Sequence, residues 1–319
     1  MLPDWWDDTL FENPSNRLTA QMSVAKYLGV RVNDIINENG VKLHTRNIRL
    51  KRGRAETPSQ VVGAVTAALH AARMTASLMQ KCLPFTGMRS ALEVRNQLLS
   101  HPECPVPNLS NLLDYCWQHG IGVVHVTRMP RVYGAKKIEG LATFIGERPV
   151  IVLCSGRSSP AWLAFHLAHE LGHVMREHVK PGELPLIDIK LESILDDDDT
   201  DEVEANQYAF QVLTGKPQPV ICGEISSGQE LATNARNYGE LHNVDPGTVA
   251  LIYGYCQKRI PMAQTALKIL EKNFSSAGEQ IANAFRKHLV LDDVPESIQR
   301  SLSTTTQIYG MTLQENSAA

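Results

Sequence analysis

Apolar and polar positions follow two different periods along this chain. Three short stretches, 121–127, 140–146 and 148–154, are rich in β-branched residues and lie between Gly, Pro or Arg turns, which is typical of strands. Longer stretches place their apolar residues on one face of a helical period and predict helices. The combination predicts an α+β fold that is mainly helical and contains a small β-sheet.

Capping residues predict where the helices begin. Thr57, Pro58 and Gln60 supply an N-cap, a proline at the first helical position and a capping-box partner. The Ala-, Val- and Leu-rich stretch behind them predicts one long helix of about six turns. Ser159 and Pro160 give the same signal for a second helix. Further helices are predicted over 90–99, 107–119, 203–214, 226–242, 245–257, 262–274 and 276–289.

Changes in composition divide the chain into four parts. A chain of 319 residues, of which 43% are hydrophobic, is long enough for more than one domain. We expect a helix-turn-helix-like domain with a basic segment over 1–56, a long connecting helix over 57–87, a core with the strands and the main motif over 88–216, and a helical C-terminal region over 217–319.

The bulk composition narrows the class of protein. A formal net charge of -3 gives no global attraction to nucleic acid or to an anionic membrane. No run approaches the roughly 18 apolar residues of a transmembrane helix, and the acidic N-terminus does not resemble a signal peptide. The 6 cysteines have no short regular spacing, which favours reduced thiols. We therefore expect a cytoplasmic protein without a membrane partner.

One motif carries candidate chemistry, the sequence HELGH over residues 169–173. Positions i and i+4 share one face of a helix, so His169 and His173 can direct imidazole nitrogens at one metal ion. Glu170 can take a proton from a water molecule there without being a ligand. The alternative is a helix with incidental histidines, and we estimate that the pattern arises by chance in roughly one or two such chains per hundred. The motif therefore predicts a zinc site with a catalytic base.

A third ligand must come from another segment, because a catalytic zinc keeps three protein ligands. The candidates are Glu202 and Glu204, which point about 200° apart on a helix, so only one can serve. With Asp201 as N-cap, Glu204 would be engaged in a capping box. We therefore expect Glu202 to be the ligand and Asn206, one turn later, to hold a ligand histidine by its other ring nitrogen.

The neighbours of the motif have less specific roles. We expect His166 to pack in the core or support the site, and His178 to be a solvated helix end. Tyr208 is a candidate oxyanion donor, although a packed core aromatic is the favoured role. Gly172 would let another backbone segment approach the motif helix. The strand over 140–145 is expected to offer an edge on which an extended substrate could pair.

Two segments together resemble a known family. The sequence AHELGHVM, followed by EVEANQYAFQVL, is similar to the ImmA/IrrE family of bacterial zinc peptidases, which pairs H-E-L/I-G-H with a downstream E-x-E-A-N/D-x-F-A helix. The resemblance covers roughly residues 90–260. The acid-rich connection between the two motifs departs from the family pattern, as does VLTGKPQP in place of the usual Leu-Met-Pro.

The resemblance implies a zincin-like peptidase core and an activity. Zn²⁺ would be held by His169, His173 and Glu202, with Glu170 as the base. The implied function is that of an endopeptidase that cleaves a helix-turn-helix repressor and releases a stress, phage-defence or mobile-element programme. Two rival functions remain: a DNA-binding transcriptional regulator whose peptidase fold senses or binds a partner, and a toxin-like protein held by a helix-turn-helix antitoxin.

The N-terminal region shows a weaker pattern. Several residues stand at the offsets of a helix-turn-helix, although Arg31 and Glu38 depart from it; they are Gln21, Val24, Ala25, Leu28, Gly29, Val30 and Ile35. The basic run behind them holds six cations that could contact phosphates: Lys42, Arg46, Arg49, Lys51, Arg52 and Arg54. The alternatives are a three-helix packing module with a solvated basic loop, and a module that docks the protein substrate. Some members of the resembling family carry an Xre-type helix-turn-helix.

Overall fold

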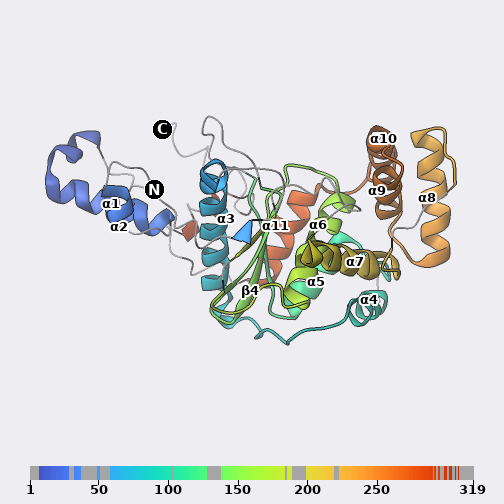
Figure 1. The fold of residues 1–319 in the computed structure, drawn as a ribbon, viewed down its shortest axis with the longest axis horizontal. Helices are drawn as coiled ribbons and strands as arrows, with labels where there is room; N and C mark the ends of the chain where they lie inside the picture. Colours follow the sequence, from blue (N-terminus) through green and yellow to red (C-terminus); the bar gives the residue numbers. More distant parts are fainter. Residues whose placement is uncertain are drawn as a thin grey trace.

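Figure 1 shows the computed structural model of the chain. It describes residues 7–28, 32–36, 49–50, 58–102, 104–127, 138–183, 185–188, 199–218, 223–289 and several isolated positions between 291 and 308. The molecule is elongated, with the helices of residues 8–36 at one end, a sheet in the middle and the helices of residues 228–270 at the other end (Figure 1). Over the described residues, no helix combines the length and the apolar character needed to cross a membrane.

The described elements confirm an α+β chain that is mainly helical. The helices are η1 (Asp8–Glu12), α1 (Pro14–Leu28), α2 (Val32–Ile36), α3 (Pro58–Leu78), η3 (Met79–Lys81), α4 (Ala91–Leu99), α5 (Leu109–Gln118), α6 (Pro160–Met175), α7 (Thr200–Thr214), α8 (Gly228–His242), α9 (Pro246–Cys256), α10 (Ile260–Leu270) and α11 (Ala277–His288). The strands are β1 (Arg49–Leu50), β2 (Gly122–His125), β3 (Gly140–Ile145), β4 (Arg148–Leu153) and β5 (Leu186–Asp188).

The five strands form one mixed sheet in the order β1-β5-β3-β4-β2. β3 and β4 are an antiparallel hairpin, β2 runs parallel to β4, and β5 runs antiparallel to β3. The prediction that β3 offers a free edge is wrong for residues 140–142, because β5 pairs with them on the side away from β4. β5 and β1 were not predicted: each is very short, one within the acid-rich connection and the other within the basic run.

Helices cover both faces of the sheet. α3 contacts β2, β3 and β4, while α6 contacts β3 and β4 and α11 contacts β2 (Figure 1). The residues of β2 are all buried, and those of β3 and β4 nearly all, which explains their continuous apolar sequences. The predicted connecting helix α3 is therefore a layer of the main core, which also includes α11. A second, smaller core joins α8, α9 and α10.

Arg95 of α4 joins the ends of two other helices. Its side chain is 6% exposed, and its guanidinium donates hydrogen bonds to the carbonyls of Val212 and Leu213 at the end of α7, at 3.1 and 2.7 Å. It also donates to the carbonyls of His242 and Asn243 at the end of α8, at 3.3 and 2.9 Å. The last carbonyls of a helix have no partner within the helix, so one buried cation satisfies four of them here.

We expect Arg95→Ala to lower the free energy of unfolding by about 3 kcal/mol, because hydrogen bonds from a charged donor are lost and buried carbonyls are left without partners. Chemical denaturation with urea measures this difference. Arg95→Lys is the control: it keeps the charge but cannot make the forked contacts, so it should recover only part of the loss. An Ala variant as stable as the wild type would contradict the role given to Arg95.

Candidate metal site

α6 carries the HELGH motif through the middle of the molecule. Its N-cap is Ser159, whose hydroxyl accepts a hydrogen bond from the backbone N–H of Trp162 at 3.3 Å, and Pro160 follows at the first position, as predicted. The helix continues without a break to Met175. His169 and His173 therefore lie on one face, and their side chains, like that of Glu170, are almost completely buried.

α7 packs against this helix at Gly172. A Cβ atom at that position would lie 3.0 Å from the Cα atom of Ala205 and 3.1 Å from its carbonyl oxygen. Only glycine allows such a close approach without displacing the neighbouring backbone. The segment that Gly172 was predicted to admit is therefore α7, and its approach brings the first turn of α7 beside the two histidines.

Three side chains converge as a result. The Nε2 atoms of His169 and His173 are 3.0 Å apart, and the carboxylate oxygens of Glu202 lie 3.4 Å from the first and 3.6 Å from the second. Donors around a tetrahedral zinc with bonds of about 2.0–2.1 Å are separated by about 3.3 Å. The separation of the two nitrogens and the approach of the two Glu202 oxygens, Oε2 to His169 and Oε1 to His173, are close to this spacing. The three residues, all buried, could hold a metal ion.

Each histidine is oriented through its other ring nitrogen. Nδ1 of His169 lies 2.9 Å from Oδ1 of Asn206, the residue predicted for this position. Nδ1 of His173 lies 3.0 Å from Nδ1 of His178, a partner that was not predicted. Both contacts leave Nε2 directed toward Glu202. A histidine that binds a metal through one nitrogen and hydrogen bonds through the other is the usual arrangement in metal sites.

The start of α7 differs from the prediction. Its N-cap is Asp199, whose carboxylate accepts a hydrogen bond from the backbone N–H of Asp201 at 3.1 Å. Asp201 lies inside the helix, so the expected capping box between Asp201 and Glu204 does not form. Glu204 instead contacts Arg176, at 3.0 Å from its Nε atom and 2.9 Å from Nη2. Glu202 is the glutamate that lies with His169 and His173, as predicted. The capping box of Glu204, from which this was predicted, does not form.

His178 is not the solvated helix end that was predicted. It is 8% exposed, because the chain turns back at Glu177, which has the left-handed φ of 60°. The backbone N–H of His178 then donates to the carbonyl of His173 at 3.0 Å. The missed signal is a non-glycine residue in a conformation that favours glycine, which sequence patterns do not reveal.

Glu170 lies directly over the first residue of β3. A Cβ atom built on Gly140 would overlap the carboxylate oxygen Oε1 of Glu170. The carboxylates of Glu170 and Glu139 also act on the nearby thiol of Cys154, where burial is the main cause that raises the pKa and the two negative charges add to it. Gly140 thus leaves the room in which the side chain of Glu170 sits.

His166 lies one turn before Glu170 on α6 and is 3% exposed. Burial lowers the pKa of its imidazole to about 3, with smaller contributions from His169 and Arg157. It is therefore neutral at physiological pH. It contributes to the packing around the motif, in line with the role expected from the sequence, and lies outside the group of three.

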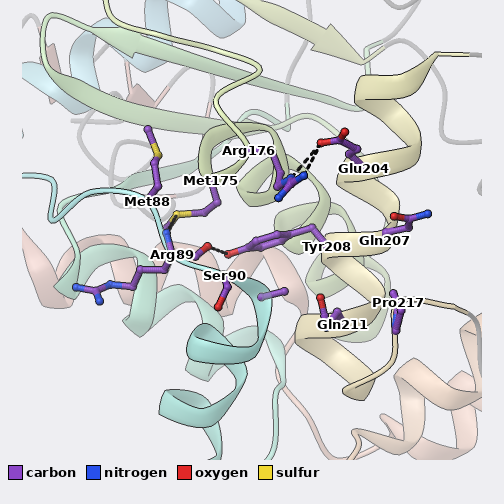
Figure 2. A pocket seen from close by; sticks show the side chains of 11 residues that line it. Met88, Arg89, Ser90, Met175, Arg176, Glu204, Gln207, Tyr208, Gln211 and Pro217 are labelled. Carbon is purple, nitrogen blue, oxygen red and sulfur yellow. Dashed lines mark hydrogen bonds and ion pairs between the residues drawn. The ribbon is translucent and has the colours of Figure 1, made fainter.

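Tyr208 makes a structural contact and is not one of the three residues that could hold a metal ion. Its hydroxyl donates to the backbone carbonyl of Arg89 at 3.0 Å, and burial raises the pKa of the phenol. Figure 2 shows this contact in a surface cavity that Tyr208 lines together with Met175, Arg176 and Glu204. The favoured role as a packed aromatic residue agrees with this geometry, and the oxyanion role gains no support from it.

The N-terminal predictions are only partly within the described residues. α1 ends at Leu28, α2 begins at Val32, and Ala25 is buried. The predicted turn at Gly29 lies outside the described residues. Of the predicted phosphate-binding cations, Arg49 lies in β1. The other five lie outside the described residues: Lys42, Arg46, Lys51, Arg52 and Arg54.

Comparison with known proteins does not assign the chain. No protein-family model matches it, and no curated protein is similar to it. The resemblance to the ImmA/IrrE family therefore rests on the motif residues and their arrangement alone.

We expect Gly140→Ala to lower any hydrolytic activity that depends on Glu170 by at least about 100-fold, because the new methyl group displaces the carboxylate. Metal affinity should stay unchanged, since the atoms that the new methyl group meets first all belong to Glu170 and none to the two histidines. Activity and metal binding, measured on the same preparation, separate the two effects. A fully active Ala variant would show that the carboxylate is not needed where the structure places it.

Proposed function

We propose that this chain is a zinc-dependent endopeptidase of the ImmA/IrrE type. The single observation that carries the proposal is the convergence of His169, His173 and Glu202 from two helices. Glu170, which is not one of the three, directly follows His169 on α6. Two imidazoles and one carboxylate are the ligand set of many catalytic zinc sites. The α+β architecture around the motif, with a mixed sheet against the motif helix, is compatible with a zincin-like core.

The bound zinc would supply a Lewis acid that polarises a peptide carbonyl and makes water more acidic. Glu170 is the residue that takes the proton from the attacking water and delivers it to the leaving amine. Glu170 directly follows His169 on α6 and is almost completely buried. Asn206 and His178 hold the two histidines in the orientation that this chemistry needs.

The substrate class comes from the resemblance. The ImmA/IrrE likeness points to a helix-turn-helix transcriptional repressor, whose cleavage would release a stress, phage-defence or mobile-element response. The sheet does not supply the predicted docking edge at residues 140–142, since β5 occupies it. Substrate pairing with β3 would therefore have to use a different part of the strand.

We expect Glu170→Gln to bind zinc as the wild type does and to lower peptide cleavage by about 100- to 10,000-fold, because the amide cannot accept the proton. A peptide library incubated with each protein and analysed by mass spectrometry measures the cleavage. A helix-turn-helix repressor encoded beside this chain, where there is one, is the first full-length substrate to test. Equal cleavage by both proteins would rule out the proposed chemistry.

A second candidate function follows from the burial of the group. His169, His173, Glu202 and Glu170 are 0–2% exposed, whereas an endopeptidase must admit a polypeptide to its metal. A closed site of this kind also suits a regulator whose metal stabilises a partner-binding or sensing module, including a toxin-like protein bound by an antitoxin. This alternative predicts that Glu170→Gln keeps full biological activity, while loss of the metal abolishes it.

The proposed DNA contact is a separate property of the N-terminal region. We expect reversal of Arg49, Lys51 and Arg52 to Glu to lower the affinity for DNA by about tenfold or more at moderate salt, because fewer phosphates are neutralised. Retention on a DNA column, measured as a function of salt, reports the change.

The control for this prediction carries the same change of charge elsewhere. Reversal of the exposed Lys258, Lys268 and Lys272 to Glu alters the net charge equally but leaves the basic segment intact. Its elution from the DNA column should stay near that of the wild type. If both triple variants and the wild type elute at the same salt concentration, the N-terminal region does not bind DNA.

A further inference from the structure

The end of α6 is built so that one histidine folds back on another. After Met175 the chain passes through Arg176 and then Glu177, whose φ of 60° lies in the left-handed region. This conformation costs about 1–2 kcal/mol for a residue other than glycine. The following N–H, from His178, closes the turn by donating to the carbonyl of His173 at 3.0 Å. The strained turn therefore places the buried imidazole of His178 beside that of His173.

The two imidazoles meet through their Nδ1 atoms, 3.0 Å apart, and their rings are inclined at 62°. Nε2 of His173 belongs to the group of three, so in a metal-bound protein it carries no proton, and Nδ1 of His173 must be the donor. Nδ1 of His178 is then the acceptor. A neutral His178 with this acceptor keeps its remaining proton on Nε2.

That second nitrogen of His178 faces two carboxylates of α7. It lies 3.4 Å from Oε2 of Glu204 and 3.9 Å from Oδ1 of Asp201. Glu204 is itself held by the guanidinium of Arg176, and hydrogen bonding to Arg176 contributes most to lowering the pKa of the Glu204 carboxyl. Figure 2 shows the Arg176–Glu204 pair on the wall of the cavity beside Tyr208. A continuous series of contacts thus runs from the surface to His173.

We propose that His178 and Glu204 are positioning residues for the metal ligand His173, connected in the order His173, His178, Glu204 and Arg176. The inference rests on the proposed metal site and not on peptidase activity. His169 has a different support, the neutral amide of Asn206. An imidazole backed by an ionised carboxylate makes the ligand it contacts more basic than an amide does, so His173 is the more strongly supported ligand.

Zinc affinity of the full chain tests the proposal, measured by competition with a chromogenic chelator. We expect His178→Ala to weaken zinc binding about 10- to 100-fold, the usual effect of losing a partner of a ligand histidine. Glu204→Gln, a change at a partly exposed position, should weaken it several-fold without affecting folding. His178→Gln should recover much of the loss, because its amide oxygen can accept from Nδ1 as Asn206 does at His169.

Two further measurements separate positioning from a general structural effect. The visible spectrum of the Co²⁺-loaded protein reports the ligand geometry, and it should change in His178→Ala and return toward the wild type in His178→Gln. The exposed residues His242 and Glu240 supply matched controls, His242→Ala and Glu240→Gln, which should leave affinity and spectrum unchanged.

The outcomes are distinct. If folded His178→Ala and Glu204→Gln bind zinc with the affinity and the Co²⁺ spectrum of the wild type, the positioning role is wrong while the metal site stands. If the wild type itself binds neither metal ion, the metal site and this inference both fail. If the predicted pattern appears in a protein that cleaves no peptide, the inference holds and the proposed peptidase function fails.

Discussion

The close approach of α6 and α7 at Gly172 is the contact on which the rest of the site depends. The motif histidines lie on one helix by local geometry alone, but Glu202 comes from a segment 29 positions after His173 in the numbering. It reaches them because α7 lies against a glycine, where a Cβ atom would contact the backbone of Ala205 at 3.0 Å. Any larger residue at Gly172 would separate the two helices and move Glu202 away from the two histidines.

Several polar contacts, some of them buried, keep α7 in this place. Arg95 donates hydrogen bonds to carbonyls at the end of α7, and Asn206 contacts His169 from the middle of α7. Glu204 contacts His178 and Arg176 from the first turns of α7. Buried polar groups of this kind are stable only when their partners are present, so they fix the register of the two helices more strictly than apolar packing does. The geometry of the three candidate ligands therefore depends on contacts along the whole length of α6 and α7.

The sequence predicted the features that depend on neighbouring residues, and it did not predict the contacts between distant segments. The helix starts at Pro58 and Pro160, the strands β2, β3 and β4, and the shared face of His169 and His173 follow from short patterns, and the structure has them. The return of His178 depends on a left-handed turn without glycine, and the contact of Gly140 with Glu170 joins a strand to a helix, so no local pattern announces either. β5 was not predicted for the same reason, because its three residues gain strand geometry through pairing with the distant strands β3 and β1.

We propose that His169, His173 and Glu202 hold a zinc ion, and X-ray absorption at the zinc edge can test this assignment. We expect one zinc per chain in a shell of nitrogen and oxygen atoms at about 2.0–2.1 Å, with two histidines contributing to the outer scattering. Replacement of His169 or His173 should remove that signature. A shell containing sulfur, or an unchanged spectrum in both histidine variants, would contradict the account.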